Sequence, residues 1–180
     1  TGVNMIHFPF YDENSVQEDW IDRNQHMNDS EYARVFSLAI DHFHDQIGLS
    51  NPERDARNYT VFTLETHINF LKELTLHTPI AIKVNIYDFD EKRTHYFLEL
   101  INRNTNEVAA TAETMMMGID KSTRHAAPYP EDIFAQIQHY AHSQNRTDWP
   151  EQLGHRIQIP KKEKTNNLSL IHISGPTRPL

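Results

Sequence analysis

Residues 28–48 read NDSEYARVFSLAIDHFHDQIG and contain the strongest periodic signal in the chain. Its apolar side chains recur as on one face of an α-helix, at Tyr32, Val35, Phe36, Ala39, Ile40, Phe43 and Ile47. Asn28 or Asp29 can cap the start of this helix, with Glu31 completing a capping box. Gly48 can end it. We therefore predict a long helix from about Asp29 to Ile47, with its wide apolar face against a sheet.

Four segments with the residue pattern of β-strands follow this helix. They run from Tyr59 to Phe70, Pro79 to Tyr87, Thr94 to Ile101 and Val108 to Ile119. Apolar and polar residues alternate within them, as in strands that bury one face. Short polar stretches at 88–93 and 102–106 have the length and composition of hairpin loops. The predicted apolar face of the first strand consists of Phe62, Leu64, Ile68 and Phe70.

Two further elements complete the predicted fold. A shorter strand is expected before the helix, near Ser15 to Trp20, and a second helix from about Pro130 to His142. Proline suits the first turn of a helix, because its missing N–H would have no partner there. This order of elements predicts an α+β fold, in which a long central helix packs on a five-stranded antiparallel sheet and a C-terminal helix follows.

The composition limits the class of protein. The chain has 180 residues, a length typical of one domain, and it contains no cysteine. Disulfide scaffolds, thiol nucleophiles and cysteine metal sites are therefore excluded. The net charge of -8 argues against nucleic acid as a partner. No run approaches the roughly 18 apolar residues of a membrane span, and residues 1–10 do not resemble a signal peptide. We expect no membrane partner and a location in the cytoplasm.

The C-terminal end differs from the rest of the chain. Residues 168–180 read LSLIHISGPTRPL and resemble a translated sequencing adapter. The polar run before them has no periodicity, so we expect residues 161–180 to form a disordered linker and a non-native tail. The remaining chain divides into residues 1–127, which hold the predicted sheet and long helix, and a C-terminal helical extension at 128–160. The first residue is Thr1, which suggests a fragment or a processed start.

The segment before the long helix, DWIDRNQHMNDSEY at residues 19–32, contains the residues suited to chemistry. Unpaired backbone N–H groups at a helix start point outward, and the helix dipole favours negative charge there. A carboxylate beside those donors can attack a carbonyl or activate water. Asp22 is placed for this role.

The same segment resembles the hot-dog-fold acyl-CoA thioesterases of the 4-hydroxybenzoyl-CoA thioesterase type. Their motif, roughly Asp-x-x-Gly-His-Val/Met-Asn-Asn-x-x-Tyr, compares with DRNQHMNDSEY at residues 22–32. The stretch is most similar to betainyl-CoA thioesterases of carnitine breakdown. Gln25 stands where the family has Gly, so a positive φ at this position would be strained.

The resemblance implies a role for each matching residue. Asp22 would be the catalytic carboxylate, as nucleophile or as general base. The backbone N–H near Asp29 would polarise the thioester carbonyl. His26 and Asn28 would shape the turn and contact the acyl group, although Asn28 could serve only as a helix cap. Tyr32 would pack under the site.

Substrate contacts are less determined. A betainyl group would need aromatic faces, for which Trp20 is the first candidate, unless it packs in the core. Glu65 and His67 share one parity of their strand and could face substrate, solvent or a subunit interface. Basic side chains that could contact the phosphates of coenzyme A are Lys72, Lys83, Lys92, Arg93, Arg103, Lys121 and Arg124.

The resemblance also implies an acyl-CoA substrate, self-association as a dimer or tetramer, and an association with a carnitine dehydrogenase domain or partner. No cofactor and no metal site are predicted: His139 and His142 could share a helix face, but no third ligand lies near them in sequence. Two alternatives remain open. One is a hot-dog hydratase or dehydratase, whose loop contains a proline that Asp22-Arg-Asn24 lacks. The other is a non-catalytic hot-dog protein that binds acyl-CoA.

Overall fold

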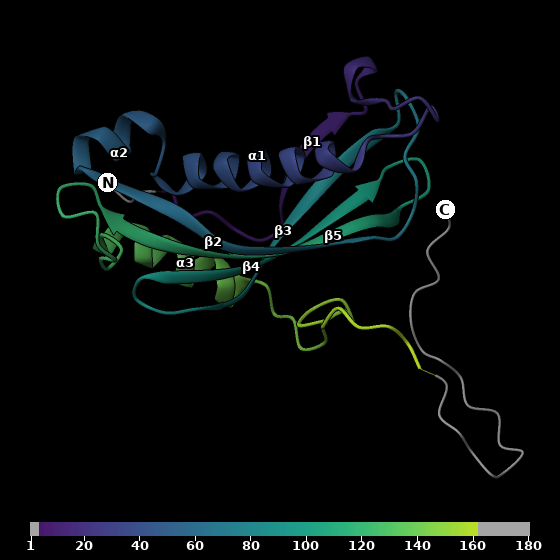
Figure 1. The fold of residues 1–180 in the computed structure, drawn as a ribbon. Helices are drawn as coiled ribbons and strands as arrows, with labels where there is room; N and C mark the ends of the chain where they lie inside the picture. The colour runs from purple at the N-terminus through teal and green to yellow at the C-terminus, as the bar shows by residue number, and fades with distance from the viewer. Residues whose placement is uncertain (1–3, 162–180) are drawn as a thin grey trace, which may run out of the picture.

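A computed structural model describes residues 4–161. One long helix, α1 (Asp29–Ile47), lies along one face of a five-stranded sheet (Figure 1). The α+β prediction is confirmed. Of the linker and tail predicted at 161–180, residues 162–180 lie outside the described residues.

The helix α1 has the bounds and the buried face that the sequence predicts. All seven of the predicted face residues are buried, and His44 joins them. Asn28 is the N-cap, and its side chain accepts the N–H of Ser30 at 3.1 Å. The predicted capping box is wrong, because the Asn28 N–H donates to the Trp20 carbonyl instead, at 2.9 Å. Gly48 ends the helix in the left-handed conformation, with φ 101°.

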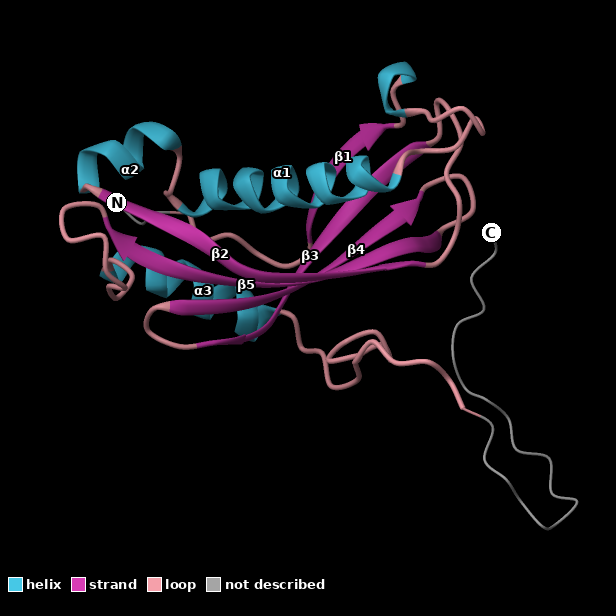
Figure 2. Cartoon of the chain, in the orientation of Figure 1, coloured by secondary structure: helices cyan, strands magenta, loops and turns pink. Residues whose placement is uncertain are grey.

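The sheet is antiparallel throughout, with strand order β1-β3-β4-β5-β2. Its strands are β1 (Phe10–Ser15), β2 (Tyr59–Phe70), β3 (Pro79–Phe89), β4 (Arg93–Asn102) and β5 (Glu107–Asp120) (Figure 2). The four later strands match the prediction. The predicted strand at 15–20 is wrong: β1 ends at Ser15, and a 3-10 turn, η1 (Glu18–Trp20), follows. This turn buries Trp20, and a buried residue after polar ones has the same sequence pattern as a strand.

A β-bulge interrupts β2 between Thr63 and Glu65. Before the bulge, the odd-numbered Val61 is buried, whereas beyond it the even-numbered Ile68 packs on the core. A bulge adds one residue to its strand and thereby exchanges the two faces. The single apolar parity predicted for β2 is therefore wrong, and Phe62, which precedes the bulge, is 39% exposed.

The helix α3 (Glu131–Ser143) continues the sheet edge along β3 from the point where β1 begins. The Tyr140 hydroxyl accepts the N–H of Phe10 at 2.9 Å and donates to the carbonyl of Val84 on β3. The Gln144 side chain then forms two hydrogen bonds with the backbone of Ile86, at 2.6 and 2.7 Å. A side-chain amide thus takes the place of a neighbouring strand. A short helix, α2 (Asn51–Arg57), was not predicted, because it buries no residue and has no apolar periodicity.

The sheet face away from α1, called the outer face below, is also covered. Phe97 and Asn85 on this face have no exposed surface, yet neither belongs to the main core cluster. Residues 144–154, called the strap below, lie over them: Arg146 Nη1 donates to Asn85 Oδ1 at 3.0 Å and to Glu99 Oε1 at 3.1 Å. Within residues 4–161, no helix is long and apolar enough to span a membrane.

Candidate active site

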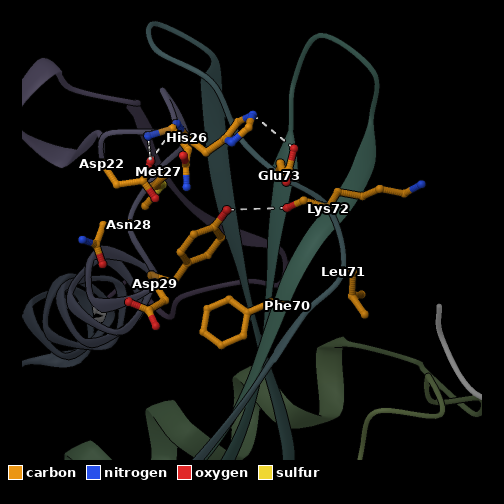
Figure 3. A pocket seen from close by; sticks show the side chains of 11 residues that line it. Asp22, His26, Met27, Asn28, Asp29, Phe70, Leu71, Lys72 and Glu73 are labelled. Carbon is orange, nitrogen blue, oxygen red and sulfur yellow. Dashed lines mark hydrogen bonds and ion pairs between the residues drawn. The ribbon is translucent and has the colours of Figure 1, made fainter. Parts of the chain in front are cut away.

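A cavity of about 590 Å³ opens where the loop before α1 meets the connection from β2 to β3. The backbone joins these two segments: the Met27 N–H donates to the Leu74 carbonyl at 2.8 Å, and His26 forms a bridge with Thr75. Figure 3 shows Asp22, Asn28 and Asp29 along one wall and Phe70 to Glu73 along the other. The predicted site residues Asp22, His26, Asn28, Asp29 and Tyr32 all line this cavity.

The Asp22 carboxylate organises the loop from one of its two oxygens. Its Oδ1 accepts the N–H of Asn24 at 2.8 Å and the N–H of His26 at 3.3 Å. In the described part of the chain, Oδ2 has no hydrogen-bond partner, so this oxygen remains available at the cavity. Gln25 has φ 65°, as expected for a position where the family has Gly. The loop therefore holds a residue with a side chain in a strained conformation.

The start of α1 presents backbone donors to the same cavity. The Asn28 side chain accepts the backbone N–H of Ser30, the second residue of α1. Within residues 4–161, the backbone N–H of Asp29 has no acceptor, and Asp29 lines the cavity. A free N–H at a helix start is aligned with the positive end of the helix dipole, so it can stabilise an oxyanion.

Two aromatic rings contribute to the apolar part of the lining, together with Met27 and Leu71. The rings of Tyr32 and Phe70 meet edge to face, with their centroids 5.2 Å apart. The Tyr32 hydroxyl donates to the Lys72 carbonyl at 3.5 Å. Burial raises the pKa of Tyr32 to about 12, so its hydroxyl stays neutral at physiological pH. Tyr32 therefore offers the cavity a ring and no charge.

A polar contact between His26 and Glu73 joins the two walls of the cavity. His26 Nε2 lies 3.1 Å from Glu73 Oε2, which links the loop before α1 to the β2–β3 connection. The Lys72 ammonium lies 3.9 Å from Glu107 and extends away from the other labelled side chains (Figure 3). Sequence reasoning did not select Phe70 or Glu73 for the site. Both lie about 40 residues beyond the motif, and only the sheet topology brings them to it.

Three predicted substrate contacts lie elsewhere. Trp20 is 4% exposed and does not line the cavity, and the Arg34 guanidinium covers its ring at 5.1 Å from the centroid. Glu65 and His67 lie on the outer face, because they pair with Met115 and Glu113 of β5. Their contact with substrate stays a prediction that this cavity does not support.

Residues 4–161 contain no group of three or more His, Asp or Glu side chains placed to hold a metal ion. His139 contacts His7, with 3.2 Å between the nearest ring nitrogens.

Comparison with known proteins agrees with the motif and the fold. Residues 16–137 match the family described as the Thioesterase-like superfamily. The chain belongs to this superfamily. The predicted hot-dog fold and the assignment to the acyl-CoA thioesterases are thereby confirmed at the level of the family. The match includes the loop before α1, the four strands β2 to β5 and the first half of α3, and it begins directly after β1.

The related sequences include betainyl-CoA thioesterases. The chain is 30% identical over 148 residues to the betainyl-CoA thioesterase of Pseudomonas aeruginosa, covering 82% of this chain and 93% of that protein. It is 34% identical over 135 residues to the L-carnitine dehydrogenase/betainyl-CoA thioesterase of a Rhizobium species. That match covers 73% of this chain and 27% of the Rhizobium protein, so this chain spans about a quarter of the fused relative.

Solved structures show the same architecture. A Staphylococcus aureus protein solved in complex with CoA is 42% identical, with a TM-score of 0.83, over 88% of this chain and 100% of that one. A 1,4-dihydroxy-2-naphthoyl-CoA thioesterase from Synechocystis is 16% identical, with a TM-score of 0.66, over 72% of this chain and 96% of that one. The second likeness is evidence for the fold alone.

Proposed function

We propose that the protein hydrolyses an acyl-CoA thioester in the cavity between the loop before α1 and the β2–β3 connection. One observation supports this most directly: the Asp22 carboxylate, with Oδ2 unbonded in the described residues, and the unbonded N–H of Asp29 line the same cavity. A carboxylate and a fixed N–H donor are the groups that acyl transfer to water needs.

In the proposed reaction, the thioester carbonyl oxygen accepts a hydrogen bond from the Asp29 N–H. Asp22 Oδ2 either takes a proton from water as the water adds to the carbonyl carbon, or attacks that carbon itself to form an anhydride that water then cleaves. In both routes the C–S bond breaks, the thiolate of coenzyme A takes up a proton, and the free acid leaves. Single-turnover hydrolysis in heavy-oxygen water separates the routes, because only direct attack leaves the label in the Asp22 carboxylate.

A cationic, betainyl acyl group is the favoured substrate. The lining combines the rings of Tyr32 and Phe70 with the carboxylates of Asp22, Asp29 and Glu73. Aromatic faces and nearby negative charge both favour a quaternary ammonium group. The sequence similarity to betainyl-CoA thioesterases supports the same choice. Of the basic side chains considered for the phosphates of coenzyme A, Lys72 borders the cavity.

Betainyl-CoA and its neutral isostere, 3,3-dimethylbutanoyl-CoA, test both parts of the proposal. The two acyl groups differ only in a quaternary nitrogen in place of a carbon. Thiol release should be measured for both with a thiol reagent, together with acetyl-CoA. We expect kcat/KM for betainyl-CoA to exceed that of the isostere by about tenfold or more, the value of roughly 1.4 kcal/mol of cation recognition. Equal values would contradict the cation preference, and no thiol release from any of them would contradict the hydrolase.

Self-association, a cytoplasmic location and a carnitine dehydrogenase partner remain part of the proposal. In the described residues β2 pairs only with β5, so its other edge is open to a second copy of the chain. The fused Rhizobium relatives support a dehydrogenase partner, because a thioesterase in the same pathway would act beside it. Sedimentation of the purified protein, alone and with such a dehydrogenase, measures both associations.

A further inference from the structure

The strap crosses the outer face of the sheet from one strand to the next. Arg146 pairs with Asn85 on β3 and with Glu99 on β4. The Trp149 ring packs edge to face on Phe97 of β4, with centroids 6.2 Å apart. Trp149 also packs on Tyr87 of β3, with ring centroids 5.2 Å apart, so this part of the strap covers the neighbouring strands β3 and β4.

The end of the strap reaches β5, and the residue that follows it reaches β2. The Gly154 N–H donates to Glu113 on β5 at 2.8 Å, and the ring of His155 stacks on His67 of β2, with centroids 6.0 Å apart. The chain therefore arrives at the free edge of the sheet at His155. Figure 1 shows the following residues, in yellow, as a stretched trace that leaves the domain below the sheet.

Residues 155–160, called the arm below, read HRIQIP. Ile157 and Ile159 are 81% and 83% exposed, more than any other large apolar side chain of residues 4–161. In an extended chain, residues two apart point to the same side. The arm thus presents two isoleucines together to solvent, at a cost that a partner surface would remove.

Within residues 4–161, the strand edge that His155 reaches is the edge of β2, which pairs with β5 on one side and with no strand on the other. This strand has 12 residues, and its exposed apolar side chains, Phe62 and Leu64, are 39% and 51% exposed. A long, apolar, unpaired edge strand is a template for pairing with another strand. The opposite edge is less suitable: β1 has six residues, and its Asp12 and Glu13 form ion pairs.

Symmetry connects the arm to this edge. When two β2 strands pair antiparallel along their whole length, the first residue of one lies opposite the last of the other. Phe62 of the second copy then lies opposite His67, the point where the arm leaves the sheet. Strands in a sheet are about 4.8 Å apart, and an extended chain advances about 3.3 Å per residue. An extended arm is therefore long enough for Ile157, two residues beyond His155, to reach the second copy, and for Ile159 to extend past its β2.

We propose that the arm packs on a second copy of this chain, with Ile157 and Ile159 covering the outer face of that copy around its Phe62 and Leu64. Two arms, one from each copy, would then clamp a dimer that is joined along β2.

Photocrosslinking tests this geometry directly. Because the chain contains no cysteine, a single introduced cysteine is the only site that a maleimide labels. The Ile159→Cys variant is labelled with a maleimide benzophenone, and isotopically light and heavy proteins are mixed before illumination. We expect crosslinks between a light and a heavy chain, with the attachment in Tyr59–Phe70. A chain that is monomeric under these conditions, or crosslinks confined to one chain, would overturn the proposal.

Affinity provides the second measurement. The I157S/I159S double variant should raise the dimer dissociation constant about 10- to 100-fold, as determined by sedimentation. The matched control is R156S/Q158S, which changes the alternate residues of the same arm and should leave the constant within about threefold of the original. Equal dissociation constants for I157S/I159S and the unchanged protein would show that the arm does not hold the dimer. Thermal unfolding of the variants checks that the domain itself is unaltered.

Discussion

The two ends of α1 differ in how their backbone groups are satisfied. At the C-terminal end, Gly48 turns the chain, Leu49 donates back to the His44 carbonyl at 2.8 Å, and Arg54 Nε donates to the Leu49 carbonyl at 2.8 Å. At the N-terminal end, the Asn28 side chain accepts one N–H, whereas the N–H of Asp29, a residue that lines the cavity, has no acceptor within residues 4–161. One helix therefore has a closed end that contributes stability and an open end that is available to a ligand.

The open end should depend most strongly on one negative charge. Asp22→Asn keeps an oxygen that can accept the N–H groups of Asn24 and His26, but it removes the carboxylate. We expect kcat for the best acyl-CoA substrate to fall about 10²- to 10⁴-fold with little change in thermal stability. Asp19→Asn, a nearby change outside the cavity lining, is the control. Full activity in folded Asp22→Asn would remove Asp22 from the mechanism.

The closed end should be sensitive to acid. Arg54 donates to His44 Nδ1 at 3.2 Å, so His44 must carry its proton on Nε2, which donates to the Tyr96 hydroxyl at 2.9 Å. Burial, with the nearby Arg54 charge, lowers the pKa of His44 to about 3.

The sign of the effect follows from the lowered pKa. Below about pH 6.5, His44 binds a proton in the unfolded chain but stays neutral in the folded chain. The stability that neutral His44 contributes is therefore complete above that pH. It falls by up to about 1.4 kcal/mol per pH unit as the pH drops toward 3. Urea unfolding between pH 7 and pH 4 measures the slope, and His44→Gln should reduce it. An unchanged slope in that variant would assign the acid sensitivity to other groups.

The cap of the open end should have a smaller effect on stability. Asn28→Ala removes the acceptor of the Ser30 N–H and should lower the free energy of unfolding by about 1 kcal/mol. Asn28→Asp retains a capping oxygen and should stay close to the original value. Urea unfolding at pH 7 compares the three proteins, and equal stability of the alanine and asparagine forms would contradict the capping role.

The smallest expected effect lies in the loop that leads to the open end. Gln25→Gly relieves the positive φ of 65° but also frees the unfolded chain. Relief of the strain favours the folded state by roughly 1–2 kcal/mol. The greater conformational entropy of glycine in the unfolded chain opposes folding by roughly 0.5–1 kcal/mol. We therefore expect the free energy of unfolding to rise by about 0.5–1 kcal/mol. A loss of stability in the glycine variant would mean that the Gln25 side chain makes a contribution larger than its strain.

The sequence predicts well where one local pattern decides the structure. The face of α1 repeats over five turns, and the four later strands alternate between polar loops, so their bounds follow from periodicity. Prediction fails where a non-local contact decides. The strand expected at 15–20 is a turn because Trp20 is buried by η1, and the faces of β2 exchange at a bulge that no residue type marks.

The candidate site divides in the same way. Asp22, His26, Asn28, Asp29 and Tyr32 lie within eleven consecutive residues, so a motif can select all of them. Phe70 and Glu73 belong to the opposite wall, which forms only when β2 and the chain beyond it pass beside the loop. Side chains of that wall have no spacing relation to the motif, and only the folded sheet identifies them.

The side-chain amide of Gln144 has a consequence for how far the sheet can grow. By bonding both backbone groups of Ile86, it ends the ladder of β3 beyond the short, charged β1. A sheet with two receptive edges can add neighbours without limit and form fibres, whereas a sheet with one can add a single symmetric neighbour and stop. One glutamine at the end of α3 would thus keep the proposed assembly of this protein finite.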